Sequence, residues 1–400
     1  MIQIFAGRRR VTALASLCVC WAAATVHAQW TVIHLQPSAP AVDSHGRGIA
    51  GSVQGGDVTV GNSGHAALWR NTSAWVDLHP DGATNSSVTG VTATQQAGTT
   101  QLSGSYHASL WNGTASSRID LHPVGYSQSF AYAIAPGQQG GSVNVAGFYH
   151  ASIWAGSASS WADLHPSAAI QSVVIGVGGG QQGGYATVGN INCASVWSGT
   201  PASWVNLRPG NSQESIVNGV SGGQQVGNAR IGQIYSASLW AGTAASWVNL
   251  NPAGSILSSC FGVQGGKQVG YATIGNVERA GIWSGTAASW IDLHAFLGVA
   301  YSRSRALGVW TDVAGIHVIG YGLNTALFRD EALLWTFSLA PVCPADVTGD
   351  GVVDGADFIA FINSFGTGSP AIDPVADINH DGIIDGNDFI EFINGFSAGC

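Results

Sequence analysis

Short apolar segments separated by turn-forming residues recur along most of this chain. In the clearest copy, GYATIG (270–275), AGIW (280–283) and SWIDLH (289–294) are rich in β-branched and aromatic residues, and Gly, Ser, Asn or Thr clusters separate them. A further segment, QSVVIGV (171–177), precedes the Gly-Gly-Gln-Gln turn of its copy. Such segments are typical of antiparallel strands joined by tight turns. Helical periodicity is absent from them, so each copy predicts four short strands.

These segments belong to a repeat of 43 residues. Its most regular marker is a proline, found at Pro37, Pro80, Pro123, Pro166, Pro209 and Pro252, and the next step reaches Ala295. The tryptophan that ends the third predicted strand occurs seven times, at Trp69, Trp111, Trp154, Trp197, Trp240, Trp283 and Trp335. Four strands in about 40–45 residues is the size of one propeller blade. The pattern therefore predicts an all-β seven-bladed propeller over residues 29–342.

The two ends of the repeat region complement each other. The seventh unit has three predicted strands but lacks the W-x-D-L-H-P ending after Trp335. The missing piece lies at Trp30–Pro37, whose proline stands one repeat before Pro80. An open solenoid would gain nothing from such half-repeats. We therefore expect the N-terminal strand to complete the last blade and close the ring.

The third predicted strand carries a short motif that points to a family. It reads HAALW (65–69), HASLW (107–111) and HASIW (150–154), and later copies read CASVW, SASLW and AGIW. This unit resembles the bacterial extracellular repeats of the HAF family, named for a His-Ala-Phe motif, over roughly residues 30–340. The resemblance implies a propeller-like extracellular module and no activity.

Composition and charge refine this picture. Glycine accounts for 56 of the 400 residues, about twice the usual share, and charged residues account for only 9%. Hydrophobic residues make up 46% of the chain and include 15 tryptophans, so the chain has enough apolar side chains to form a core. Residues 343–400 carry a net charge of −10 with no Lys or Arg, and residues 29–342 a net charge of −2. We expect no nucleic-acid partner, because binding phosphates needs a basic face.

The N-terminus has the pattern of an export signal. Arg8, Arg9 and Arg10 precede an apolar stretch from Val11 to Thr25, and Val26-His27-Ala28 is a small-x-small cleavage site. We expect residues 1–28 to be a signal peptide removed after Ala28, which places the protein outside the cell or on its surface. No later stretch is long and apolar enough to predict a transmembrane segment.

Two twelve-residue segments of the acidic tail place oxygen side chains in a metal-binding pattern. Residues 346–357 read DVTGDGVVDGAD and residues 377–388 read DINHDGIIDGND, with Gly351 and Gly382 at the sharp turn of loop position 6. The first predicted calcium site consists of Asp346, Thr348, Asp350, the carbonyl of Val352, Asp354 and Asp357. The second consists of Asp377, Asn379, Asp381, the carbonyl of Ile383, Asp385 and Asp388. Calcium is favoured over magnesium because many protein oxygens on a flexible loop suit the larger ion.

Each calcium loop is followed by one predicted helix with an apolar face. The two faces have the same spacing of i, i+3, i+4 and i+7, and they consist of Phe358, Phe361, Ile362 and Phe365, and of Phe389, Phe392, Ile393 and Phe396. A duplicated loop with only its exiting helix resembles the dockerin type I module, here over residues 343–400. The resemblance implies two bound calcium ions and a cohesin-like or envelope partner. In place of the Ser-Thr pair usual at positions 10 and 11, this chain has Gly355-Ala356 and Gly386-Asn387.

Four cysteines remain after the predicted cleavage. Cys343 and Cys400 bracket the acidic tail, and export would allow a disulfide between them to persist. The spacing of Cys193 and Cys260 leaves the state of their thiols open.

Motifs that could carry catalysis are better explained by the repeat. Gly219-Val220-Ser221-Gly222-Gly223 fits a nucleophile elbow and Gly178-x-Gly180-x-x-Gly183 fits a dinucleotide fingerprint, but both fall in predicted hairpin turns with no helix behind them. Two sets of histidines recur, at His65, His107 and His150, and at His79, His122, His165 and His294. Equivalent copies lie in different blades, so we expect structural hydrogen bonds and no metal cluster.

The sequence favours a secreted or surface-displayed binding protein with no catalytic site. Its ligand would be a protein or a glycan, bound at the turns after the tryptophans and at the divergent stretch from Ala300 to Asp312, which contains Arg303, Arg305 and Trp310. This stretch is either an insertion on one propeller face or a structurally decayed terminal repeat. The alternatives are a glycoside hydrolase or lyase and a structural protein of the cell envelope. Glycan hydrolysis generally needs two carboxylates about 5–10 Å apart. Asp77, Asp120, Asp163 and Asp292 recur at one repeat position and are therefore interpreted as structural.

Overall fold

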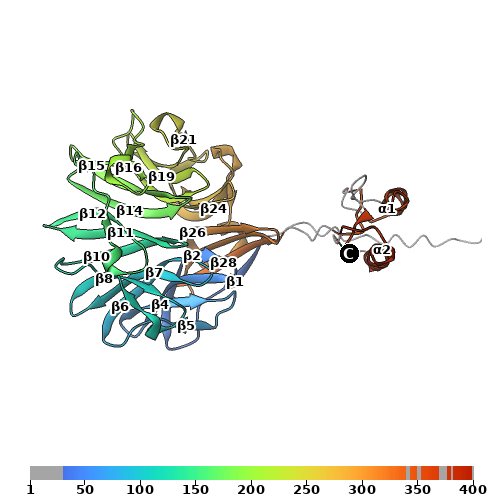
Figure 1. Cartoon of the computed structure of the whole chain (residues 1–400), viewed down its shortest axis with the longest axis horizontal. Helices are drawn as coiled ribbons and strands as arrows, with labels where there is room; N and C mark the ends of the chain where they lie inside the picture. The colour runs from blue at the N-terminus through green and yellow to red at the C-terminus, as the bar shows by residue number, and fades with distance from the viewer. Residues whose placement is uncertain (1–29, 339–342, 349–352, 369–375, 380–381, 399–400) are drawn as a thin grey trace, which may run out of the picture.

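The computed structural model describes residues 30–338, 343–348, 353–368, 376–379 and 382–398. Residues 30–338 form seven four-stranded antiparallel sheets, arranged in chain order around a ring (Figure 1). The strands of the first six blades are β2 (Ala41–Ala50), β3 (Val53–Val60), β4 (Ser63–Trp69) and β5 (Trp75–Asp77); β6 (Ala83–Val91), β7 (Gln96–Leu102), β8 (Ser105–Trp111) and β9 (Ile119–Asp120); β10 (Ser129–Ala135), β11 (Gln138–Val145), β12 (Phe148–Trp154) and β13 (Ala162–Asp163); β14 (Gln171–Gly178), β15 (Gln181–Val188), β16 (Ile191–Trp197) and β17 (Val205–Asn206); β18 (Glu214–Ser221), β19 (Gln224–Ile231), β20 (Ile234–Trp240) and β21 (Val248–Asn249); and β22 (Ser255–Gln264), β23 (Lys267–Ile274), β24 (Val277–Trp283) and β25 (Ile291–Asp292). The predicted seven-bladed propeller is confirmed.

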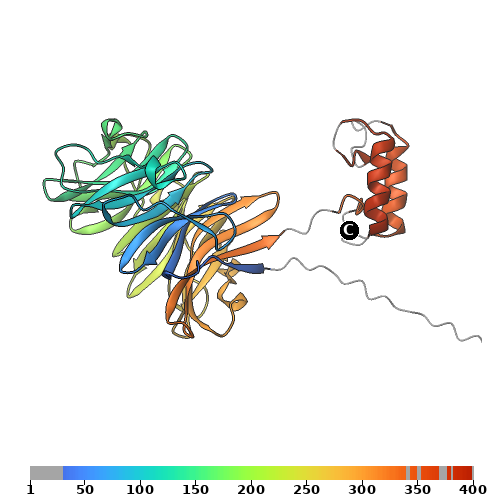
Figure 2. The same ribbon diagram turned by 90° about the horizontal axis from the view of Figure 1, so that it is seen from below.

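The last blade joins the two ends of the ring, as predicted. It consists of β26 (Tyr301–Asp312), β27 (Gly315–Asn324), β28 (Arg329–Ser338) and the N-terminal strand β1 (Trp30–His34). Strand β1 runs antiparallel to β28, with Trp30 opposite Phe337 and His34 opposite Leu333. Figure 2 shows the blue N-terminal strand beside the orange strands of this blade. The ring is therefore held shut by a strand from the opposite end of the chain.

One tryptophan per blade fills the space between neighbouring blades. All seven predicted tryptophans are at most 1% exposed. Trp111 of the second blade packs with Leu68 and Leu78 of the first, and Trp69 of the first packs with Leu334 of the seventh. Burying one such side chain contributes roughly 4–6 kcal/mol as an upper estimate. The repeated tryptophan thus joins each blade to the preceding one, including across the closure.

The inner strand of each blade carries a buried serine that bonds to the preceding blade. Its hydroxyl accepts a hydrogen bond from a backbone N–H of the preceding blade's third strand, as Ser86 does from Ala66 at 2.8 Å. The seven serines are Ser44, Ser86, Ser129, Ser172, Ser215, Ser258 and Ser304. At the closure, Ser44 accepts from Ala332, 288 residues away. The sequence interpretation missed this set, although its members repeat in register.

The outer strand of each regular blade is shorter than predicted. In the segment SWIDLH only Ile291 and Asp292 pair with β24, because a 3-10 turn precedes them. These turns precede the outer strands of blades two to six and are η1 (Ala115–Ser117), η2 (Ala158–Ser160), η3 (Pro201–Ser203), η4 (Ala244–Ser246) and η5 (Ala287–Ser289), while η6 (His294–Phe296) follows β25. Ser289 closes the turn by donating to Thr286 and accepting from Ser284. Serine and threonine side chains therefore favour a turn where a full strand was expected.

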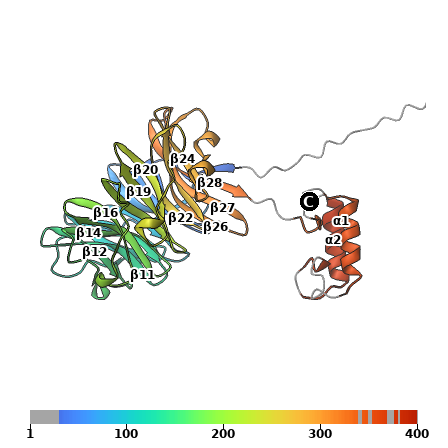
Figure 3. The ribbon, with the colours of Figure 1, turned by 90° about the horizontal axis from the view of Figure 1, so that it is seen from above.

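The tail contains two helices, α1 (Gly355–Phe365) and α2 (Gly386–Ala398), which lie side by side (Figure 3). Phe361 and Phe392 are fully buried between them, with stacked rings whose centroids are 4.1 Å apart. Of the predicted apolar faces, Phe361, Phe365, Phe392, Ile393 and Phe396 pack in the small core of this module, whereas Phe358, Ile362 and Phe389 are exposed. Cys343 is disulfide-bonded, whereas its expected partner Cys400 lies outside the described residues. Cys193 and Cys260 are free and buried.

The predicted signal peptide, residues 1–28, also lies outside the described part of the chain. Among the residues that are described, no helix is long and apolar enough to cross a membrane.

Candidate functional sites in the tail loops and the central channel

The first calcium loop converges on the carboxylate of Asp357 at position 12. Asp357 is fully buried and accepts hydrogen bonds from the backbone N–H and the hydroxyl of Thr348, both at 2.9 Å, and from the N–H of Asp354 at 2.8 Å. Burial alone would raise the pKa of Asp357, but these hydrogen bonds outweigh it and lower the pKa. Asp354 also caps α1 by accepting from Ala356. Loop positions 3, 9 and 12 are therefore brought together.

The second loop repeats this arrangement. The carboxylate of Asp388 is fully buried and accepts from the N–H groups of Asn379 and Asp385 at 3.2 and 2.8 Å. Gly382 adopts φ +84° and donates its N–H to Asp377 at 3.1 Å, so the turn residue reaches back to the carboxylate of position 1. A positive φ of this size suits glycine.

The donor set of both loops fits a hard cation. Asp346, Thr348, Asp354 and Asp357, and Asp377, Asn379, Ile383, Asp385 and Asp388, are described, whereas Asp350, Val352 and Asp381 lie outside the described residues. Among the described residues, no three His, Cys, Asp or Glu side chains lie close enough together to hold a metal ion. The chemistry of the set is nevertheless that of calcium, because it offers oxygen ligands throughout and its position-12 carboxylates are already fixed by hydrogen bonds.

The propeller has a second candidate site along its central channel. Every inner strand contains a β-bulge at the same repeat position, where a single residue is skipped in the pairing with the next strand, and four of these strands have a second register shift nearer their start. The skipped residues are Arg47, Thr89, Tyr132, Ile175, Asn218, Phe261 and Leu307. All seven line a cavity of about 550 Å³. Because bulges redirect side chains, each blade presents one residue of variable type to the channel.

Glycines after the bulges let the inner strands approach one another. A Cβ at Gly176 would lie 3.0 Å from the Cα of Gly219, and a Cβ at Gly48 would lie 3.1 Å from the Cα of Gly90. Larger side chains are therefore disfavoured at this level of the ring, where the third blade has Ala133 in place of glycine, and the bulged residues dominate the channel. The sequence interpretation missed these positions because their types differ, but a variable residue before a repeated Gly-Val or Gly-Ile marks most of them.

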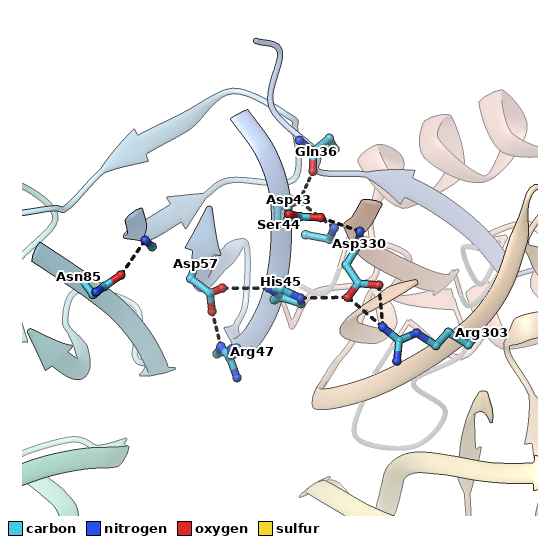
Figure 4. A network of polar contacts seen from close by, with 11 residues as sticks. Gln36, Asp43, Ser44, His45, Arg47, Asp57, Asn85, Arg303 and Asp330 are labelled. Carbon is cyan, nitrogen blue, oxygen red and sulfur yellow. Dashed lines mark hydrogen bonds and ion pairs between the residues drawn. The ribbon is translucent and has the colours of Figure 1, made fainter. Parts of the chain in front are cut away.

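A charged network lies where the channel meets the closure of the ring (Figure 4). His45 lies 2.9 Å from Asp57 of the first blade and 3.4 Å from Asp330 of the seventh. Arg47 pairs with Asp57, and Arg303 pairs with Asp330 at 3.1 Å. Burial opposes the charge on His45, yet the carboxylates of Asp330 and Asp57 outweigh it and raise the pKa of His45 to about 9. At neutral pH the imidazolium therefore bridges the two ends of the ring.

The divergent stretch from Ala300 to Asp312 is not an insertion on a propeller face. Tyr301–Asp312 is the inner strand of the seventh blade, and the additional residues lengthen its strands and form η6. Arg305 makes a two-pronged ion pair with Glu278 and lies over the ring of Tyr271. Trp310 donates to Asp312 at 3.0 Å. Arg305 thus joins the sixth and seventh blades, and the expectation of an insertion on a propeller face is wrong.

The recurring histidines make hydrogen bonds, as predicted. His65 bonds to Asp77 at 2.8 Å and stacks on His79, whose Nδ1 lies 2.8 Å from the hydroxyl of Ser86 and whose Nε2 lies 3.1 Å from the carbonyl of Ala83. A carbonyl only accepts, so Nε2 carries the proton and Ser86 donates to Nδ1. Burial and the neighbouring His65 both lower the pKa of His79. The second and third blades repeat this stack.

The two glycine motifs lie in turns, also as predicted. Ser221 ends β18, and Gly222 and Gly223 form the turn with φ of +57° and +78°. Gly179 and Gly180 form the equivalent turn between β14 and β15. No helix follows either motif in this part of the propeller, so neither is a nucleophile elbow or a phosphate cradle.

Comparison with solved structures reveals a shared fold. A puromycin hydrolase mutant complexed with PGG is 11% identical with a TM-score of 0.50, and it is matched over 78% of this chain and 58% of that chain. The propeller domain of the trilobed protease from Pyrococcus furiosus, described as having an open velcro topology, is 9% identical with a TM-score of 0.47, over 75% of this chain and 98% of that chain. TolB from Acinetobacter baumannii is 11% identical with a TM-score of 0.42, over 57% and 58%. The chain thus spans little more than half the length of the first and third of these structures.

The tail has a match at the level of sequence. A search of curated proteins finds no match to the chain. Residues 344–397 match the family model of the dockerin type I domain. Such domains bind calcium and cohesin partners and are typically extracellular or displayed at the cell surface. The chain therefore consists of a seven-bladed β-propeller followed by a dockerin type I domain.

Proposed function

We propose that this chain is a secreted or surface-displayed binding protein without enzymatic activity. Its propeller, which we assign to the HAF-type repeats, recognises an extracellular ligand. Its dockerin domain binds two calcium ions and attaches the propeller to a cohesin-like or envelope partner. The observation that carries this proposal is the pairing of a docking module with a ring whose variable side chains gather in one channel.

The carboxylates of the propeller support a binding role. All of them except the exposed Asp81 make a described hydrogen bond or ion pair, and most partners are histidine, arginine or tyrosine. These residues are Asp43, Asp57, Asp77, Asp120, Asp163, Glu214, Glu278, Asp292, Asp312, Asp330 and Glu331. Most of these contacts join neighbouring strands or blades. Carboxylates with such partners are better explained as structural residues than as the two catalytic carboxylates of a glycoside hydrolase.

The docking half of the proposal is tested by surface binding. The mature protein, residues 29–400, is passed over immobilised type I cohesin in calcium buffer and then in chelator. We expect retention with calcium and release with chelator. The matched control is residues 29–342, which keep the ring and should not bind. Retention of the control, or retention that ignores the chelator, would contradict the assigned docking role.

A further inference from the structure

A groove opens from the channel over the second blade. Its volume is about 360 Å³, and Arg47, Thr89 and Tyr132 line both the groove and the channel. The other lining residues are Asp57, Gly64, Asn85, Ser86, Ser87, Thr99, Gln101, Tyr106 and Phe130. The groove is therefore an extension of the central cavity between the first and third blades.

The groove exists because two positions carry small residues. The second residue of the third strand is Gly64 in the first blade, whereas the equivalent residue is tyrosine in three other blades, at Tyr106, Tyr149 and Tyr235. The inner-strand residue after the buried serine is Ser87 in the second blade and Phe130 in the third. The missing side-chain volume leaves room for the groove at this interface.

One wall of the groove is an aromatic ledge. The rings of Phe130 and Tyr132 are almost parallel, with an interplanar angle of 2° and centroids 5.9 Å apart. Tyr106 adjoins Phe130 at 5.3 Å. Aromatic faces are electron-rich and attract weakly positive C–H groups as well as apolar surface. The ledge would therefore accept the C–H face of a flat, saturated ring.

The remaining walls offer hydrogen-bonding groups of both kinds. The side-chain amide of Asn85 donates a hydrogen bond to the side-chain oxygen of Gln101 and accepts one from the backbone N–H of Gly64. These bonds fix the side chain of Gln101 at the groove. The hydroxyls of Ser87 and Thr99 can donate and accept. The charged lining residues, Arg47 and Asp57, pair with each other through Nε, which leaves the terminal amino groups of Arg47 available to a ligand. The groove thus offers a few hydrogen-bonding groups beside a mostly apolar wall, and its one acidic and one basic lining residue pair with each other.

On these grounds we infer that the groove binds a neutral saccharide. A pyranose ring has an apolar C–H face, which fits the Tyr106–Phe130–Tyr132 ledge, and a rim of hydroxyls, which fits Arg47, Gln101, Ser87 and Thr99. An acidic saccharide would bring its charge close to the carboxylate of Asp57, which also lines the groove, so a neutral ring is favoured. The inference rests on the proposed function, because it names the ligand class and its place on the propeller.

The test measures binding of cellohexaose, xylohexaose, mannohexaose and polygalacturonate to the mature protein by calorimetry. We expect at least one neutral hexasaccharide to bind and polygalacturonate not to bind. The substitution Gly64→Tyr should abolish binding by filling the groove, and the fold should tolerate it, since a Cβ there is 3.6 Å from its nearest neighbours. Asn192→Tyr places the same side chain at the equivalent position of the fourth blade and is the control.

A second variant keeps the test independent of the first. Tyr106→Ala removes one ring of the ledge and should weaken binding about tenfold, whereas Tyr106→Phe should retain most of it. Binding that is unchanged in both Gly64→Tyr and Tyr106→Ala would overturn the inference, as would binding of polygalacturonate alone or of none of the four. Release of new reducing ends from a bound sugar would instead overturn the non-enzymatic function while leaving the groove assignment intact.

Discussion

The propeller and the dockerin domain satisfy their polar groups in opposite ways. The propeller has a net charge of −2, and its blades are joined by buried tryptophans and by serine hydroxyls that bond to backbone amides. The tail has a net charge of −10 and a small core around Phe361 and Phe392. We therefore expect the ring to be stable through its own contacts and the fold of the tail to depend on bound cations. Under the proposed function, the chain would combine a stable binding domain with a docking domain that requires calcium.

The largest difference should appear on removing calcium. Eight carboxylates in two short loops repel one another until an ion neutralises them. We expect residues 343–400, studied as an isolated fragment, to gain helix on adding calcium and to lose it with chelator, as followed by circular dichroism. The fragment 29–342 under the same treatment should not change. A helical spectrum of the tail that ignores the chelator would contradict the account.

The ring should respond most strongly to loss of its latch. Deleting residues 29–39 removes β1, in which Trp30 to His34 pair with β28. The edge of β28 is then left unpaired and exposed. We expect aggregation and a melting temperature lower by on the order of 10 °C or more, as measured by calorimetry. Deleting the tail instead should leave the transition of the ring almost unchanged. If the two deletions change the melting temperature equally, the N-terminal strand does not hold the ring closed.

A single serine should have a smaller effect. In Ser129→Ala the buried N–H of Ala108 loses its acceptor, and His122 loses its bond to the hydroxyl. Leaving a buried donor unsatisfied costs about 1–3 kcal/mol, which corresponds to roughly 2–10 °C in melting temperature. Ser116→Ala, in the exposed turn η1, is the matched control and should be neutral. An equal effect of both substitutions would show that the inter-blade bond does not matter.

The closure of the ring should add a modest dependence on pH. The pKa of His45 rises from 6.5 to about 9 on folding, so the charged form stabilises the ring below pH 6.5 and this stabilisation is lost as the pH rises through 9. Denaturant titrations should show that the wild type loses more stability between pH 6.5 and 9.5 than His45→Gln does. If the stability of both proteins changes equally with pH, the charge of His45 does not stabilise the closure of the ring.

The stacked histidines should act in the opposite direction. Burial, reinforced by the neighbouring imidazole, lowers the pKa of His79, His122 and His165, so their stabilisation is present above 6.5 and is lost as the pH falls through the lowered values. The pH range of greatest stability is therefore expected near neutrality.

The repeat allowed the fold to be predicted, and its exceptions explain what was missed. Trp69 and its six equivalents identify the blades because the same packing problem recurs at each interface, and Trp30–Pro37 could be recognised as the missing strand for the same reason. The bulged channel residues have no common type, so Arg47 and Tyr132 could not be recognised as equivalent by their own side chains; only the Gly-Val or Gly-Ile that follows most of these positions repeats. The extra length near Arg305 suggested an insertion because spacing alone does not tell a lengthened strand from an insertion.

Binding without turnover is the central claim, and mass spectrometry tests it most directly. The mature protein is incubated for hours with each saccharide that it binds, with calcium present, and the saccharide masses are followed over time. We expect bound ligand and unchanged masses throughout. Shortened products that disappear when one propeller carboxylate is replaced by its amide would contradict the claim and identify the propeller as an enzyme.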